Sequence, residues 1–329
     1  MLFRSAGGLG NIYQYTTNPS VATGDGIAMA HRAGADIINA EFVQFHPTAL
    51  YHKDIRRFLI SESLRGEGAR LINRNGERFM ERYDARGELA PRDVVARAIF
   101  DEMARLGTSY VYLDLANHYR GELPIRERFR KIWTTCMEGG LDISRDPIPV
   151  TPAAHYFCGG VKVDERGRSS IRRLYAVGEV SCTGLHGANR LASTSLLEGL
   201  LWGAKAAADI RERLDGPRSE RLDASRLERI PEWENPANPE LFDVSLVYHD
   251  WNLIKATMWT HAGIKRTAKG LERAQADLNY HAHRIHKFYR EAELTRDIVE
   301  LRNGVTAAQL VVDAAMHNRK SLGCHFRRD

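Results

Sequence analysis

The chain has 329 residues, of which 43% are hydrophobic and 27% charged, so it is long enough for two or three domains and has the composition of a soluble globular protein. Its formal net charge is +5 with both signs mixed along the sequence, which suits an anionic ligand and gives only weak support for nucleic-acid binding. The four cysteines are isolated, which excludes a cysteine metal motif and fits a reducing cytoplasm, and no apolar run is long enough to cross a membrane.

A glycine-rich stretch, SAGGLGNIY at residues 5–13, comes first. It lacks the G-x-G-x-x-G spacing of a dinucleotide-binding turn, and no strand–G-x-G-x-x-G–helix unit occurs elsewhere in the sequence. The next turn, Thr23–Gly26, precedes a short helix expected over 27–33. Asp25 in that turn is expected to cap the helix, to bind a ligand, or to do both.

Residues 41–50, EFVQFHPTAL, are expected to form a strand that carries Gln44 and His46 on the same face. A lone histidine of this kind is more often a structural residue than a ligand. The loop LISESLRGEGAR follows at 59–70, and a hairpin turn is expected at 73–76. Three charged residues of the loop form either an ion-pair network or direct ligand contacts: Glu62, Arg65 and Glu67.

A helix is expected over 94–106, where apolar residues recur at helical spacing. Pro91 suits the start of this helix because its missing N–H costs nothing there. Arg92 and Asp93 then fall in the first turn. A cation at that end opposes the helix dipole, so the position of Arg92 favours a functional explanation.

Residues 111–113 are expected to form a strand and 125–139 a helix. The chain then enters a proline-rich stretch that ends in His155 and Tyr156, just before a Gly-Gly pair. A buried histidine beside a tyrosine would be structural unless a motif indicated otherwise.

The strand expected at 174–177 ends in Gly178-Glu179 and is followed by a polar, glycine-rich loop. Ser195-x-x-Glu198 reads as a capping box for a helix that runs to about residue 214. A strand, a polar loop and a capped helix form a ligand-facing edge of an α/β sheet, and the helix N-terminus favours an anion. The loop supplies three polar side chains: His186, Asn189 and Arg190.

The composition changes after residue 216, where a polar stretch at 217–243 is expected to be a linker. Residues 244–329 contain three helical runs with apolar spacings of three and four, which predict an antiparallel three-helix bundle. The histidines of the second run fall on more than one face, so no metal site is predicted. No function is predicted for the tail KSLGCHFRRD.

Taken together, the motifs QFHPT, APRD, PAAHYFCGG and GLHGANRLASTSLLEG resemble those of the fumarate reductase/succinate dehydrogenase flavoprotein superfamily, and most closely its L-aspartate oxidases. The resemblance implies an α/β FAD-binding domain that is incomplete, because its N-terminal dinucleotide-binding unit is missing, with an α+β capping domain and the C-terminal three-helix bundle. The implied boundaries are 1–40 and 157–216 for the FAD-binding domain, 41–156 for the cap, 217–243 for the linker and 244–329 for the bundle.

The resemblance also assigns the site. Arg92 is the expected catalytic residue, transferring a proton at the substrate, and Asp93 and Glu88 are the carboxylates expected beside it. The expected substrate-binding residues are Gln44, His46, Ser61, Glu62, His155 and Arg190. The residues expected to bind non-covalent FAD are Asp25, Glu179, Asn189, Ser195 and Leu196. No metal is expected.

The implied activity is FAD-dependent oxidation of L-aspartate to iminoaspartate, with oxygen or fumarate as acceptor, as the first step of NAD biosynthesis in the cytoplasm. Quinolinate synthase, which consumes the product, is a candidate partner, and neither nucleic acid nor a membrane is expected. Two alternatives stay open. One is a succinate dehydrogenase or fumarate reductase flavoprotein subunit, which needs an iron–sulfur partner. The other is an inactive fragment that lacks the FAD pyrophosphate site.

Overall fold

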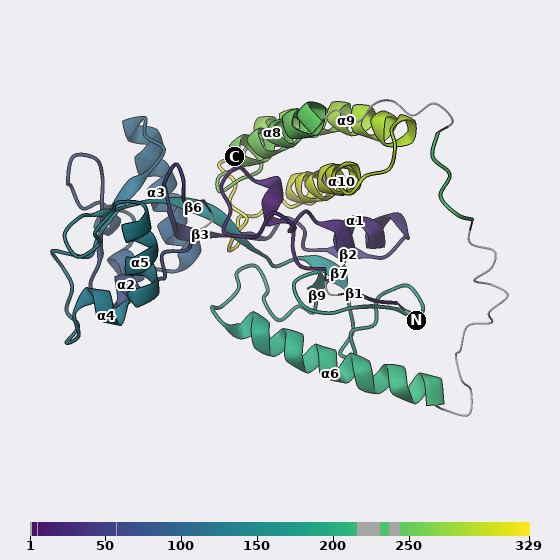
Figure 1. The fold of residues 1–329 in the computed structure, drawn as a ribbon, viewed down its shortest axis with the longest axis horizontal. Helices are drawn as coiled ribbons and strands as arrows, with labels where there is room; N and C mark the ends of the chain where they lie inside the picture. Colours follow the sequence, from purple (N-terminus) through teal and green to yellow (C-terminus); the bar gives the residue numbers. More distant parts are fainter. Residues whose placement is uncertain (1, 5, 57, 216–230, 237–243) are drawn as a thin grey trace. The chain divides into compact units, whose positions relative to one another are not determined.

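The computed structural model describes residues 2–4, 6–56, 58–215, 231–236 and 244–329 (Figure 1). The chain divides into two compact units. Unit 1 comprises Met1–Gln14, Ser20–Val43 and Tyr156–Asp329, and unit 2 comprises Tyr15–Pro19 and Gln44–His155. Most of the linker expected at 217–243 lies outside the described residues.

Unit 1 holds two small sheets. Strand β1 (Leu2–Arg4) pairs in parallel with β8 (Leu174–Ala176), close to the strand expected at 174–177. In the second sheet β7 (Gly160–Lys162) lies between antiparallel β2 (Ile37–Ile38) and parallel β9 (Ser181–Cys182). The short helix η1 (Gly10–Ile12) and helix α1 (Asp25–Arg32) precede β2.

The last part of unit 1 contains three long helices, α8 (Val244–His261), α9 (Ala268–Glu291) and α10 (Arg296–His317). Each packs against the other two, and α10 also packs against α1. Thr267 and Thr295 cap α9 and α10 by accepting hydrogen bonds from the backbone of the first turn, as threonine does at this position. The α8–α10 contact is close: a side chain at Gly304 would collide with the ring of Trp251.

Unit 2 is built on a four-stranded sheet with the order β3-β6-β5-β4, in which β3 is Val43–Leu50 and β6 is Ile148–Phe157. Strands β4 (Arg70–Ile72) and β5 (Val111–Asp114) pair antiparallel. The short helices are α2 (Ser63–Gly66), η2 (Met80–Arg82) and η3 (Gly87–Leu89). The turn expected at 73–76 is present, with Asn73 N–H donating to the Glu77 carbonyl over 3.0 Å.

Helix α3 (Arg92–Leu106) begins directly after Pro91, as the sequence predicted, and buries Val95, Ala98 and Ile99. The single helix expected over 125–139 is wrong. It is interrupted between α4 (Ile125–Arg128) and α5 (Arg130–Glu138) because Phe129 leaves the helical conformation and packs its ring into the core of unit 2.

Helix α6 (Thr194–Asp215) corrects a second prediction. Ser195 lies inside the helix, and the buried Glu198 carboxylate contacts Thr183 and His186, so these residues do not form the expected capping box. The helix is held to unit 1 at Asp209, which accepts hydrogen bonds from Tyr175 and several arginines. Much of the apolar side of α6 is solvent-exposed, including Leu196, Leu197 and Leu200.

Replacement of Asp209 should destabilise unit 1. Its side chain is 1% exposed and accepts from Arg166 over 2.9 Å, Arg168 over 2.8 Å and Arg213 over 3.0 Å. We expect Asp209→Asn to lower the free energy of unfolding by about 2–4 kcal/mol, because the arginines lose their shared carboxylate but stay partly hydrated.

Urea unfolding measures this change. Glu212→Gln is the matched control, since Glu212 pairs with the same Arg166 at 3.3 Å but is 75% exposed. Its effect should be within about 1 kcal/mol. Equal effects of the two substitutions would show that burial of Asp209 has no energetic role.

Candidate functional site

Strand β3 buries Gln44 and His46 completely in unit 2. The Nδ1 atom of His46 accepts from the Thr48 N–H over 3.2 Å, and Nε2 has no hydrogen-bond partner among the described residues. Burial, assisted by nearby His155 and Arg92, lowers the pKa of His46 well below its ordinary value. The ring is therefore neutral with its proton on Nε2, which makes it a buried donor without an acceptor. An anionic ligand would satisfy it.

His155, near the end of β6, lies beside His46, with the ring centroids 5.2 Å apart in an edge-to-face arrangement. Its Nδ1 is 2.8 Å from the Thr17 hydroxyl, which orients the ring. The structure thus brings together the two histidines that the sequence assigned to substrate binding.

Arg92 is the first residue of α3 and completes this cluster. It donates from Nε to Glu62 over 2.7 Å and from Nη1 to Gln44 over 3.2 Å. Burial alone would raise the pKa of Glu62, but the hydrogen bond and charge of Arg92 outweigh burial and lower it. The sequence suggested that the neighbouring carboxylates of Arg92 would be Asp93 and Glu88. The structure corrects this, because Asp93 pairs with Arg97 and Glu88 with Arg70.

The loop at 59–70 forms one ion pair among its three charged residues, whereas its remaining acid pairs outside the loop. Arg65 lies 3.6 Å from Glu62, and Glu67 pairs with Arg128. The Ser61 hydroxyl accepts from the N–H and hydroxyl groups of Ser63 over 3.3 and 2.9 Å, so it stabilises the start of α2. Ser61 therefore has a local structural role in addition to the substrate role expected for it.

In unit 1 the polar loop before α6 organises a second cluster around Arg190. Its guanidinium lies over the Tyr156 ring, 4.3 Å from the ring centroid, and its Nε donates to the Ser195 hydroxyl over 3.1 Å. His186 Nε2 lies 3.2 Å from the Tyr156 hydroxyl and 2.8 Å from the Glu198 carboxylate. Such a cation–π contact fixes a guanidinium without neutralising it.

Sequence reasoning missed this network. It assigned Glu198 to a helix cap, gave no role to His186 and treated Tyr156 only as a neighbour of His155. The sequence pattern that could have indicated this network is a histidine and a glutamate on either side of a polar, glycine-rich segment. That pattern alone does not predict that the two side chains are in contact.

Glu179 is partly buried next to the glycine-rich turn. Its Oε1 accepts from the Phe157 N–H over 2.9 Å, and burial raises its pKa to about 7. A side chain at Gly8 would collide with this carboxylate, so the bare backbone of Gly8 is what admits Glu179.

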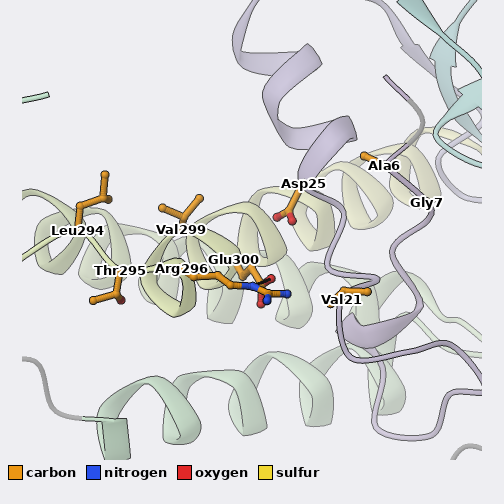
Figure 2. Close-up of a pocket in the computed structure, with 9 residues that line it drawn as sticks. All are labelled: Ala6, Gly7, Val21, Asp25, Leu294, Thr295, Arg296, Val299 and Glu300. Carbon is orange, nitrogen blue, oxygen red and sulfur yellow. Dashed lines mark hydrogen bonds and ion pairs between the residues drawn. The ribbon is translucent and has the colours of Figure 1, made fainter. Parts of the chain in front are cut away.

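Asp25 lines a cavity of about 820 Å³ in unit 1. Figure 2 shows it at the start of α1, opposite the first turns of α10. The other lining residues are Ala6, Gly7, Val21, Leu294, Thr295, Arg296, Val299 and Glu300. Gly24 occupies the N-cap position of α1, so the capping role expected for Asp25 is wrong. Its carboxylate instead accepts from Asn303 over 2.8 Å and borders the cavity.

The sites thus fall into two groups. Unit 2 holds Gln44, His46, Ser61, Glu62, Arg92 and His155. Unit 1 holds Asp25, Glu179, Asn189, Arg190, Ser195 and Leu196. Leu196 is 80% exposed.

Residues 3–196 match the family model of an FAD binding domain, which covers more than half of the chain. The chain belongs to this family. Residues 252–329 of this FAD-binding protein match a second model, the fumarate reductase flavoprotein C-term. The expectation that FAD is the cofactor is confirmed at the level of the family.

The chain is 49% identical to L-aspartate oxidase 1 of Ralstonia nicotianae and 47% identical to L-aspartate oxidase of Pseudomonas aeruginosa, in each case over 99% of the chain and 59% of the relative. It matches the solved quinol fumarate reductase of E. coli with a TM-score of 0.84 and 31% identity, over 99% of the chain and 60% of that structure's chain. The resemblance stated from the motifs is confirmed. The chain spans about three fifths of the length of these relatives.

The residues present fit FAD. Gly7 presents bare backbone to the cavity beside Asp25, with no described atom within 4 Å of the place where a side chain would begin. A carboxylate beside open backbone suits a ligand rich in hydroxyl groups. Within the described ranges no group of three or more candidate ligands could hold a metal ion. None of the described helices is long and apolar enough to span a membrane.

The raised pKa of Glu179 gives a testable pH dependence. The pKa of a glutamate in an unfolded chain is near its ordinary value of 4.5, whereas the folded group holds its proton up to about pH 7. Between these values the folded state binds more protons, so stability should fall as pH rises, by roughly 3 kcal/mol in total, and level off above pH 7.

Urea unfolding of the wild type and Glu179→Gln at pH 4.5, 5.5, 6.5 and 7.5 isolates this contribution. The difference in the free energy of unfolding between the wild type and Glu179→Gln should change steadily from pH 4.5 to about pH 7. A constant difference would mean that Glu179 is ionised in the folded protein.

Proposed function

We propose that this protein takes part in FAD-dependent oxidation of L-aspartate to iminoaspartate, with oxygen or fumarate as electron acceptor, in the first step of NAD biosynthesis. The observation that carries the proposal is the buried, neutral His46 with a partnerless Nε2 beside His155 and Arg92. Such a cluster of donors can bind a carboxylate through donated hydrogen bonds. The similarity to proteins named L-aspartate oxidase supports aspartate as the dicarboxylate.

In this proposal His46, His155 and Arg190 hold the two carboxylates of the substrate, with Gln44, Ser61 and Glu62 around them. Arg190 suits this role because its planar guanidinium can bind a carboxylate through two parallel hydrogen bonds. Non-covalent FAD, held by Asp25, Glu179, Asn189, Ser195 and Leu196, supplies the chemistry of hydride acceptance when it is bound. Fixing both carboxylates orients the substrate Cα–H, and such positioning accounts for much of the rate enhancement.

Arg92 is proposed to transfer the proton. When fumarate is reduced, a proton must reach carbon, and Arg92 can deliver it only if another group restores it. Glu62, whose side chain is 40% exposed and lies 2.7 Å from Arg92 Nε, can take up a proton from solvent and pass it to Arg92 after each transfer. Gln44, which accepts from the same guanidinium, limits its rotation.

The same proposal assigns a role to each domain of the chain. Residues 1–40 and 157–216 form the flavin-facing part of the FAD-binding domain, 41–156 the cap over the substrate, and 244–329 an antiparallel three-helix bundle after a linker at 217–243. The FAD pyrophosphate would be met by a strand–G-x-G-x-x-G–helix unit that these 329 residues do not contain. We place the protein in the cytoplasm, which suits its four free, buried cysteines, with quinolinate synthase as a candidate partner.

A second candidate is the flavoprotein subunit of a fumarate reductase or succinate dehydrogenase. The likeness to the solved quinol fumarate reductase favours it. Co-purification with an iron–sulfur protein, together with succinate oxidation and no turnover of aspartate, would support this alternative.

Two substitutions test the proposed roles in a version of the protein that carries the pyrophosphate-binding unit. Arg190→Leu should weaken dicarboxylate binding by about 2–5 kcal/mol, because a desolvated charge partner is lost in ground and transition states alike. KM for L-aspartate should therefore rise more than kcat falls. Steady-state kinetics of aspartate oxidation measures both. A large fall in kcat at unchanged KM would contradict the carboxylate role.

Arg92→Leu should instead abolish most fumarate reduction while binding of a non-reacting dicarboxylate is largely kept. Binding of the non-reacting dicarboxylate is measured by the change that it causes in flavin absorbance. Turnover is measured by the formation of succinate from fumarate. Arg97→Leu is the matched control, since Arg97 lies on the same helix and pairs with Asp93 at 2.8 Å outside the cluster. Equal loss of binding and turnover in Arg92→Leu would make Arg92 a further carboxylate ligand.

A further inference from the structure

The tail at residues 320–329, for which no function was predicted, packs against the loop that carries Arg190. Gly323 has a φ of 53°, and a side chain there would lie 2.9 Å from the Ala188 Cβ and collide with the Ala188 carbonyl oxygen. The Cys324 N–H donates to that same carbonyl over 2.9 Å. The Cys324 thiol donates to the Asn189 side-chain oxygen over 3.3 Å. Three contacts thus meet the two residues that directly precede Arg190.

The loop is held at its start by the contacts of Thr183 and His186 with Glu198, but several of its residues are costly to fix. Gly184 and Gly187 adopt left-handed conformations with φ of 85° and 52°, and Ser193 does so at 66°. Fixing each such residue costs about 1–2 kcal/mol of backbone entropy, which must be offset by contacts from elsewhere. Ala188 provides the link, because it packs on the cluster formed by Phe42, Tyr156 and Cys158.

The tail is firmly anchored on its other side. His325 is fully buried, with Nδ1 2.8 Å from Arg266 Nη1 and Nε2 2.8 Å from the Asn318 carbonyl oxygen. Arg266 is also fully buried, between α8 and α9, and donates to the backbone oxygens of Gly263 and Glu41. Because a buried guanidinium is costly unless paired, this anchor holds the tail at one position.

We propose that the tail segment Gly323–His325 is a positioning element that holds Ala188 and Asn189 and thereby fixes the guanidinium of Arg190 over the Tyr156 ring. The tail touches no reacting atom in this role. It sets the geometry of a dicarboxylate-binding residue, and to that extent the inference rests on the function proposed above. Its structural part, control of the loop by the tail, does not depend on aspartate as substrate.

Hydrogen–deuterium exchange of the peptide covering 184–191, in the whole 329-residue protein, tests the structural part directly. Gly323→Ala should exchange at least about fivefold faster there, because the tail must move away from Ala188. Gly107→Ala is the matched control: its φ is 63°, but no described atom lies within 4 Å of the added methyl group. Exchange at 184–191 in this control should match the wild type.

A second pair of variants, at Cys324, tests the same proposal if Gly323→Ala fails to fold. Cys324→Ala removes the donor to Asn189 and should also speed exchange at 184–191, whereas Cys324→Ser retains a donor and should restore most of the protection. Unchanged exchange in Cys324→Ala, at an unchanged melting temperature, would overturn the proposal.

In the version used for kinetics, Gly323→Ala should raise KM for L-aspartate about tenfold and leave kcat within about twofold, since the tail acts through a binding residue. An equal fall in kcat would overturn the positioning role. If the wild type does not oxidise aspartate, the proposed function fails, and the exchange experiment still decides whether the tail controls the loop.

Discussion

The cost of burying a charged or polar group without a partner governs both units of this protein. Glu198 is buried with Thr183 and His186, Asp209 with several arginines, and Arg266 with His325 and backbone oxygens. Each pairing ties a helix or the tail to a loop. Where a buried donor is left unpaired beside other polar side chains, as at His46 Nε2, the same cost becomes a driving force for ligand binding.

The cost of leaving a buried polar group without a partner has opposite consequences at two buried histidines. Burial lowers the pKa of His46 and of His325, the latter to about 4, so both rings are neutral. The hydrogen bonds of His325 are used up within the protein, and this ring therefore stabilises structure. His46 has one nitrogen satisfied by the backbone of Thr48 and keeps the other for a ligand. The difference arises from the neighbours of each ring, since the residue type is the same.

Local features of the sequence predicted local features of the structure. The start of α3 at Arg92 follows from the geometry of proline. Strand β3 lies within the strand expected at 41–50, but all of its residues are buried, which alternation did not predict. The motifs identified the family and its cofactor. The break at Phe129 could not be predicted, because a buried ring in the core outweighs helical propensity in a way that periodicity does not record. The capping-box prediction failed for a related reason, since tertiary contacts took Glu198 away from the helix end.

Most of the missed parts of the site depend on contacts between residues far apart in the chain, although His186 and Glu198 are only 12 positions apart. Cys324 and Asn189 are 135 positions apart, and nothing in either motif indicates the other. Glu62 and Arg92 are 30 positions apart, and the sequence offered nearer carboxylates as partners for Arg92. Residue type could suggest that a group was functional, whereas the identity of its partner required the fold.

The arrangement of the two units also sets an order of assembly during translation. Unit 2 is nearly continuous in sequence, so it can fold as soon as it leaves the ribosome, whereas unit 1 must join Met1–Gln14 to segments that end at Asp329. At a synthesis rate of about 5–20 residues per second, on the order of ten to thirty seconds separate the completion of unit 2 from the completion of the last segment of unit 1. During that interval the early strands and α1 lack their packing partners. The loop that carries Arg190 acquires its last contacts only when the tail emerges.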